Sequence, residues 1–162
     1  MEDRVAELSP ECFSLAELTN FVLQGYQAKV KQSESAISVE AESALPEVCA
    51  DKKKIQMVLE HLVDNALKYG KSRQRVEIKI KSDRVGVRWS IADQGVGIPA
   101  KDRKNIFGKF FRARNVVSRQ IDGIGLGLYI VRLVVEKSKG RVGFESQEGA
   151  GSTFWFSLPT AK

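Results

Sequence analysis

Hydrophobic side chains recur every three or four residues in three stretches of the chain, which predicts three amphipathic helices. The first begins after Ser14, a good capping residue, and its apolar positions are Leu15, Leu18, Phe21, Val22 and Tyr26. The second begins after Asp51 and has the strongest pattern, at Ile55, Val58, Leu59, Leu62, Val63, Ala66 and Leu67. Gly70 is expected to end it as a left-handed cap. The third helix is expected from about Leu128 to Lys137.

Alternating apolar and polar residues predict strands at 76–81 and 85–91, joined as a hairpin by the short turn 82–84. Shorter runs predict strands at 37–41 and 46–50, and a last hairpin pairs 142–146 with 153–158. After a turn at 93–99, a long polar and basic stretch of low periodicity up to residue 122 is typical of a functional or mobile loop. This order of elements favours an α/β fold in which helices cover one face of a mixed, mostly antiparallel sheet.

The composition fits one globular domain, since the 162 residues are 43% hydrophobic and 28% charged. No apolar run reaches the ~20 residues of a membrane span and no secretory leader is present, so an intracellular setting is expected. Cys12 and Cys49 are too few and too isolated to predict a disulfide framework or a zinc cluster. Residues 1–13 carry no strong pattern and are expected to belong to a preceding segment.

A net charge of +6 raises the question of nucleic-acid binding. Seven basic residues and one acid, Asp102, lie between positions 101 and 119, without the aromatic residues of a base-stacking surface. A bound polyphosphate explains this local charge as well as DNA does, and a solvated face is the simplest alternative. We therefore expect no nucleic-acid partner; a nucleic-acid-binding domain would show steeply salt-dependent binding.

Three glycines at alternate positions, Gly123, Gly125 and Gly127, precede the third helix. Such a run does not suit the interior of a strand or helix, because glycine offers no side chain and costs backbone entropy. A glycine-rich loop that opens a helix presents unpaired N–H groups and a positive dipole end, which suits a phosphate. The alternative is a flexible loop before an ordinary core helix.

A polar stripe lies beside the apolar face of the second helix, because four residues fall within about 100° of one another: His61, Asn65, Lys68 and Tyr69. Together an amide, an ammonium group and a phenol ring can hold a metal ion, a phosphate and a heterocycle. Mg²⁺ accepts an amide oxygen alongside phosphates and waters. The alternative is a solvated face. His61 is the only histidine, which excludes a His-pair zinc site and gives a Ser-His-Asp triad little support.

Asp93 ends a predicted strand and is followed by Gly95 and Gly97. A carboxylate there can accept a hydrogen bond from an amine, while the glycines let a flat ring approach the backbone. The alternative is an ordinary turn that leaves the strand. The dinucleotide-binding pattern G-x-G-x-x-A also fits residues 95–100, but no apolar helix follows, so we reject it.

Five motifs in this order resemble the catalytic ATP-binding domain of sensor histidine kinases, within the wider GHKL group of ATPases. They are the Asn-bearing helix, Asp-x-Gly-x-Gly after a strand, the Phe-rich loop 106–112, the three glycines, and Gly-x-Gly-Ser-Thr at 149–153. The resemblance implies a two-layer, Bergerat-type α/β sandwich at residues 14–160 that binds ATP and Mg²⁺. Residues 1–13 would be a stub or linker from a preceding dimerisation domain.

The family's functional residues can be carried over where the motifs match. Asn65 matches the Mg²⁺ ligand, while Lys68 and Arg112 match phosphate-contacting residues; these three are the expected catalytic residues. Tyr69 matches an aromatic residue near adenine and ribose, and Asp93 matches the carboxylate that reads the adenine amino group. The other residues expected to bind the nucleotide are His61, Gly95, Gly97, Ile98, Lys109, Phe110, Gly123, Gly125, Leu126, Gly127, Leu128 and Thr153.

Two positions depart from the family pattern: His61 stands where these kinases usually have Asn, and Gly108 where they usually have Glu. The gyrase-type and chaperone relatives carry a general-base Glu at the position of His61, so its absence argues against ATP hydrolysis by water. The phosphoacceptor motif, a His followed by an acidic residue and a downstream Pro, is missing. The resemblance therefore implies a chain that binds nucleotide but does not phosphorylate itself.

The implied context is two-component signal transduction in the cytoplasm. The domain would present the γ-phosphate to a histidine of a separate dimerisation and phosphoacceptor domain, and a response regulator would follow indirectly. The isolated domain is expected to be monomeric and the parent protein a homodimer. Two alternatives keep the fold: a nucleotide-dependent binding module or pseudokinase, and a serine kinase of the anti-sigma-factor type, whose phosphoprotein would be acid-stable.

Overall fold

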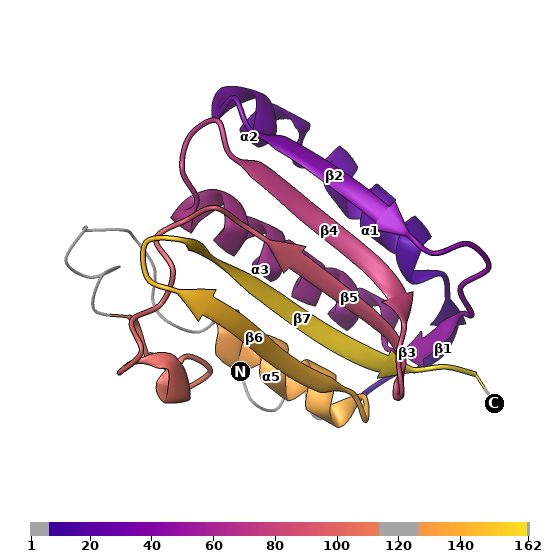
Figure 1. Ribbon diagram of the computed structural model, residues 1–162. Helices are drawn as coiled ribbons and strands as arrows, with labels where there is room; N and C mark the ends of the chain where they lie inside the picture. The colour runs from indigo at the N-terminus through magenta and orange to yellow at the C-terminus, as the bar shows by residue number, and fades with distance from the viewer. Residues whose placement is uncertain (1–6, 114–126, 162) are drawn as a thin grey trace.

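The central sheet of the computed structural model, which describes residues 7–113 and 127–161, has five strands (Figure 1). Across the sheet they are β2 (Ala36–Ala41), β4 (Arg75–Ser82), β5 (Gly86–Ala92), β7 (Gly151–Pro159) and β6 (Arg141–Gln147). The pair β2–β4 is parallel, and the other three neighbouring pairs are antiparallel. The prediction of a mixed, mostly antiparallel sheet is confirmed.

Three helices pack on one face of this sheet: α1 (Leu15–Gln24), α3 (Lys52–Tyr69) and α5 (Gly127–Lys137) (Figure 1). They occupy the segments predicted to be helical. The side chains of Ser14 and Asp51 cap α1 and α3, as predicted, by accepting hydrogen bonds from backbone N–H groups three residues on. The short helix α2 (Gln27–Gln32) and the 3₁₀ turn η2 (Arg103–Asn105) lie outside the predicted elements. In the described part of the chain, no helix is long and apolar enough to cross a membrane.

The core lies between the helices and the sheet, and Trp89 of β5 is fully buried in it. Its indole N–H donates to the hydroxyl of Thr19 at 3.0 Å, and its ring stacks on Phe156 with 5.5 Å between centroids. A buried indole with its donor satisfied stabilises the interior through both area and a hydrogen bond. Trp89 therefore links the centre of the sheet to α1.

One side chain of α1 differs from its predicted position. Phe21 is 59% exposed, whereas Leu15, Leu18, Thr19 and Val22 are buried. The buried face of the helix is thus the side on which Thr19 meets Trp89, and Phe21 lies outside that face. The expectation that Phe21 belongs to the core is wrong.

Gly70 follows α3 but is not the left-handed cap predicted, because its φ of −79° and ψ of 167° are extended. A Cβ at Gly70 would lie 1.7 Å from the side chain of Gln74. That buried amide donates to the carbonyl oxygen of Ala66 at 2.9 Å and accepts from the backbone N–H of Gln94 at 3.0 Å. Glycine is needed here for space, and Gln74 joins the end of α3 to the loop after β5.

A second sheet of two short strands, β1 (Glu11–Phe13) and β3 (Val48–Ala50), lies at one end of the domain (Figure 1). Cys12 and Cys49 face each other across it and form a disulfide bond. The sequence did not predict this bond, since the cysteines are too few and too isolated for a disulfide framework, and residues 11–13, which form β1, were expected to belong to a stub or linker. Strands of three residues are too short for alternation to reveal them.

The part of the chain between the end of β5 and the start of β7 begins and ends at backbone positions that lie opposite each other. Ala92, the last residue of β5, lies opposite Thr153 in the antiparallel pairing of β5 with β7. The chain between them includes α5, which packs on the sheet, and β6, which pairs with β7 at the sheet edge, and it returns to the strand beside its starting point.

We expect Gln74→Ala to lower the free energy of unfolding by about 2 kcal/mol, because it leaves a buried carbonyl and a buried N–H without their partner. Denaturant unfolding would measure this loss. The matched control is Lys79→Ala on the exposed face of β4, the strand that follows Gln74, which should change stability by less than about 0.5 kcal/mol. Equal stability of the two variants would contradict the bridging role of Gln74.

Candidate functional site

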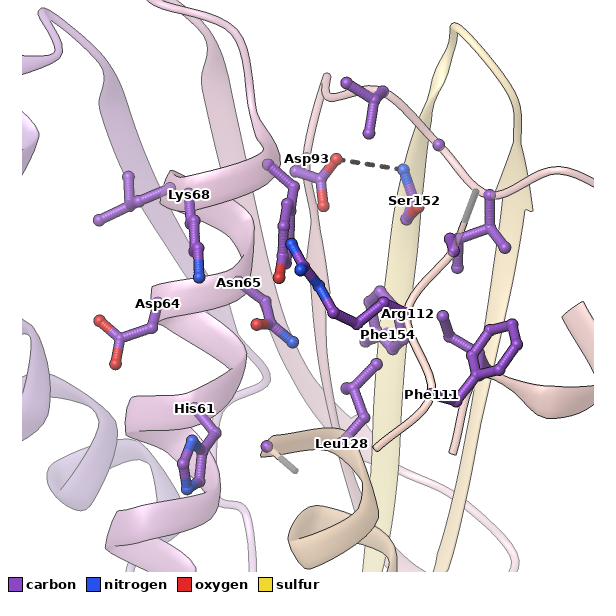
Figure 2. A pocket seen from close by; sticks show the side chains of 18 of the residues that line it. His61, Asp64, Asn65, Lys68, Asp93, Phe111, Arg112, Leu128, Ser152 and Phe154 are labelled. Carbon is purple, nitrogen blue, oxygen red and sulfur yellow. Dashed lines mark hydrogen bonds between the residues drawn. The ribbon is translucent and has the colours of Figure 1, made fainter. Parts of the chain in front are cut away.

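A cavity of about 940 Å³ opens between α3, the loop after β5, the start of β7 and the start of α5 (Figure 2). Its walls bring together residues that are far apart in the sequence. Of the predicted site residues, those lining it are His61, Asn65, Lys68, Tyr69, Asp93, Gly97, Ile98, Arg112, Gly127 and Leu128.

The wall from α3 carries the predicted polar stripe, with His61, Asn65 and Lys68 on successive turns (Figure 2). The side chains of His61 and Asn65 make no hydrogen bond to the residues that the structure describes. Tyr69 is half-buried; burial raises its pKa, and the positive charge of Arg112 acts in the opposite direction. The ammonium group of Lys68 lies 5.5 Å from the centre of the Tyr69 ring. The stripe therefore offers polar groups that are available to a ligand.

Asp93 is held at the end of β5 by two backbone N–H groups. Its Oδ1 accepts from Gly95 at 2.9 Å and from Ser152 at 3.2 Å, while Oδ2 has no partner among the described residues. Burial raises the pKa of the Asp93 carboxyl above its usual value, and these two hydrogen bonds partly offset that rise. An oriented carboxylate with one unused oxygen is a hydrogen-bond acceptor for an amine.

The two glycines after Asp93 allow close approach of the main chain. A Cβ at Gly95 would lie 2.3 Å from the carbonyl oxygen of Tyr69, and one at Gly97 would lie 2.0 Å from that of Gln147. Gly97 also has a φ of +67°, which favours glycine. Gly95 supports Asp93 without lining the cavity, whereas Gly97 lines it.

Arg112 brings a cation into the cavity without a counter-charge. Its Nε and Nη2 atoms are buried and have no hydrogen-bond partner in the described residues. Buried N–H groups of a cation without partners are costly, because they are removed from water and nothing replaces their lost hydration. Figure 2 shows Arg112 reaching from its loop across the cavity toward α3. This geometry is what an anion with several oxygens would satisfy.

The Phe-rich loop contributes a different residue from the one expected. Phe111 lines the cavity, whereas Phe110 is 62% exposed and has a φ of +61°. Lys109 also lies outside the cavity, with its ammonium group 5.8 Å from the centre of the Tyr129 ring. The sequence places two adjacent aromatic residues here, and only the turn of the backbone decides which one faces inward.

The start of β7 shows a similar difference of one residue. Ser152 and Phe154 line the cavity, whereas Thr153 does not and lines only an adjoining shallow depression of about 350 Å³, which Asp93 and Ser152 also border. Because strand side chains alternate, a single position decides the face. The sequence contained a signal for Ser152 and Phe154, since Phe154 shares the core face with Phe156.

Three of the predicted residues, Gly123, Gly125 and Leu126, lie outside the described residues, as do Arg114 and Arg119 of the basic cluster. Gly127 approaches α3 so closely that a Cβ would lie 3.3 Å from His61 Nδ1. The described basic residues of the cluster other than Arg112 are exposed, as a solvated face would be: Lys101, Arg103, Lys104 and Lys109.

Metal ligands are sparse in this cavity. Within residues 7–113 and 127–161 there is no group of three or more His, Cys, Asp or Glu side chains that could hold a metal ion. A cation bound here would depend on oxygen atoms of a ligand and of water. The unpartnered amide of Asn65 fits such a site as a single protein ligand.

The family described as histidine kinase-, DNA gyrase B- and HSP90-like ATPase matches residues 50–162. The adaptive-response sensory kinase SasA of Synechocystis is 34% identical over 147 residues, which cover 90% of this chain and 38% of SasA. The sensor histidine kinase AruS of Pseudomonas aeruginosa is 42% identical over 111 residues, covering 66% and 11%. This chain thus spans well under half the length of these relatives.

Solved structures of similar proteins share the fold. Full-length ShkA in complex with AMPPNP superposes with a TM-score of 0.84 at 28% identity, over 99% of this chain and 34% of ShkA. The nucleotide-free catalytic domain of the histidine kinase ThkA has a TM-score of 0.82 at 27% identity, over 94% of this chain and 98% of that domain. The predicted resemblance and the predicted α/β sandwich are confirmed.

We expect Arg112→Met to leave the stability of the ligand-free domain unchanged or to raise it, because Met has a similar length and buries no charge. Binding of inorganic tripolyphosphate should weaken at least about tenfold through loss of charge-assisted hydrogen bonds. Denaturant unfolding and calorimetric titration measure the two effects. Arg132→Met, on the exposed side of α5, is the matched control and should change neither. Destabilisation by Arg112→Met with unchanged anion binding would refute the role.

Proposed function

The chain belongs to the family of histidine kinase-, DNA gyrase B- and HSP90-like ATPases, and we propose that it is the ATP-binding catalytic domain of a sensor histidine kinase. Most of the described chain would form this domain, and the residues before β1 would lead into it from a dimerisation domain. The domain would bind ATP with Mg²⁺ and present the γ-phosphate to a histidine of a separate phosphoacceptor domain. A response regulator would receive the phosphoryl group in turn.

The observation that carries this proposal is the presence of an oriented acceptor and an unpaired cation in one cavity. The unused oxygen of Asp93 suits the amino group of adenine, and the unpaired guanidinium of Arg112 suits phosphate oxygens. Ile98 and Phe154 give the cavity an apolar lining beside Asp93 that suits a flat ring. A base, a ribose and a chain of phosphates match this succession of groups.

Within this proposal each side chain has a distinct task. Arg112 and Lys68 would hold the phosphates, and Tyr69 would pack near the base and ribose. Asn65 would hold Mg²⁺ through its amide oxygen, and the ion supplies charge neutralisation at the phosphates when bound. Phosphoryl transfer needs mostly positioning and charge stabilisation, which these groups provide without a general base for water.

His61 lies where such a base would stand in the hydrolytic relatives, and no acidic side chain replaces it. Its imidazole lines the cavity beside Gly127. Transfer to a protein histidine needs no activated water, since the neutral imidazole of the acceptor is itself a nucleophile. This favours the kinase over an ATPase that uses water.

We expect calorimetric titration with ADP to show one site in the wild-type domain. Asp93→Asn should abolish measurable binding, because it replaces the acceptor oxygen by a competing donor or leaves the amine unpaired. Asn65→Ala should keep weak ADP binding but remove its dependence on Mg²⁺. Glu77→Gln, on the exposed face of β4, is the control for loss of a carboxylate.

A folded wild type that binds no nucleotide would exclude the kinase and favour a degenerate binding module. A wild type that binds ADP but does not transfer labelled phosphate from ATP to an isolated phosphoacceptor domain would favour a pseudokinase. Acid-stable label would identify a serine kinase, because phosphohistidine is lost in acid.

The affinity for ADP should fall as the pH is lowered through the pKa of Asp93 in the free domain. Burial raises this pKa above 3.8, and the ionised carboxylate accepts from the adenine amino group more strongly than the neutral acid does, so protonation weakens binding. Titrations across this pH range would show it, with inosine diphosphate, which lacks the amino group, as the control. For the free domain the sign is opposite: its stability should fall as pH rises through the same range.

A further inference from the structure

The disulfide bond between Cys12 and Cys49 lies away from the cavity and is not used by the proposed function. It joins β1 to β3 at directly opposed positions and closes a stretch of chain with a sequence separation of 37. We propose that this cysteine pair is a thiol–disulfide exchange site, and that its co-reactant is a dithiol. Its oxidation state determines whether the segment 7–13, called the incoming segment below, is tied to helix α3.

Access to the bond is unequal on its two sides. Cys12 is an exposed residue, whereas Cys49 is half-buried between Val48 and Ala50, which are both buried. Exchange requires an attacking thiolate to reach a sulfur atom in line with the bond that breaks. The open side is therefore the Cys12 sulfur, and the leaving group is the Cys49 thiolate.

The exchange balances as a two-electron reduction. A thiolate of the dithiol attacks Sγ of Cys12, a mixed disulfide forms, and the Cys12–Cys49 bond breaks with its electron pair on Cys49. The second thiol of the reagent then attacks the reagent's own sulfur atom in the mixed disulfide and releases Cys12 as a thiolate. The dithiol is oxidised to a disulfide, and two protons reach the two cysteines. Oxidation by a disulfide such as oxidised glutathione reverses the sequence.

The bond is connected to α3 through very short paths. β3 ends at Ala50, and the next residue, Asp51, caps α3 through the backbone N–H of Lys54. The other oxygen of Asp51 accepts from the backbone N–H of Ser9 at 3.0 Å. The ammonium group of Lys54 also donates to the carbonyl oxygen of Glu7. The incoming segment is thus attached to the first turn of the helix that carries Asn65.

Once the bond is reduced, few contacts hold the incoming segment. Three residues of β1 pair with β3, Phe13 is buried, and the hydrogen bonds at Asp51 and Lys54 remain. Strand pairs this short are marginal without a covalent link. Phe13 keeps the end of the segment in the core, whereas residues 7–12 then depend on these few hydrogen bonds and open more often. The cavity, which is built by the opposite end of α3, retains its shape.

The test compares the oxidised and reduced wild-type domain by hydrogen exchange read out by mass spectrometry. Dithiothreitol is the reducing probe and oxidised glutathione the oxidising one. Reduction should add the mass of two hydrogen atoms and expose two titratable thiols. Amide exchange in residues 7–13 and in the first turn of α3 should then accelerate at least about tenfold, while β4 and β5 are unchanged. The midpoint of thermal unfolding should fall by about 5–10 °C.

The double variant Cys12→Ser/Cys49→Ser is the matched control. It should resemble the reduced wild type under both conditions and show no response to either reagent. Three outcomes overturn the proposal: two thiols that oxidised glutathione does not join, a bond that dithiothreitol does not reduce in the folded domain, or reduction without faster exchange in residues 7–13. Because none of these readouts uses nucleotide, the result does not depend on whether the domain is a kinase.

Discussion

The buried amide of Gln74 determines how the two halves of the cavity face each other. It bridges the carbonyl oxygen of Ala66 in α3 and the backbone N–H of Gln94 after β5. One turn away, the N–H of Val96 donates to the carbonyl oxygen of Tyr69 at 3.1 Å. These hydrogen bonds join α3 to the main chain of the loop after β5, beneath the side chains that line the cavity. The polar stripe of α3 can face Asp93 only while these bonds hold, so ligand recognition depends on residues that contact no ligand.

The electrostatics of the cavity oppose folding and favour a ligand. Nε and Nη2 of the half-buried Arg112 have no partner among the described residues, and burial raises the pKa of the Asp93 carboxyl. These opposite charges do not form an ion pair with each other among the described residues. Each is instead directed at the space between them, where a ligand with a donor at one end and anionic oxygens at the other would satisfy both. Strain of this kind is common at binding sites and is relieved by binding.

Periodicity was sufficient to predict the parts of the site that lie on regular elements. The stripe of His61, Asn65 and Lys68 follows from helical geometry, and Asp93 follows from its place at the end of an alternating strand. The failures arise where one position decides the outcome. Phe111 rather than Phe110 lines the cavity because of a turn that no propensity specifies, and Ser152 rather than Thr153 lines it because side chains alternate along β7. The pairing of Cys12 with Cys49 depends on tertiary packing of strands too short to leave a pattern.

The pairing of Ala92 with Thr153 has an evolutionary consequence. Between them the chain leaves β5, forms α5 and returns to the sheet through β6, so the two ends of this segment are already held together by the β5–β7 ladder. The entropy of closing such a loop grows only slowly with its length. Insertions or deletions between β5 and α5, which leave α5 and β6 in place, therefore cost the sheet little. One wall of the cavity can diverge in length and composition while the opposite wall, on α3, stays under the constraints of the core.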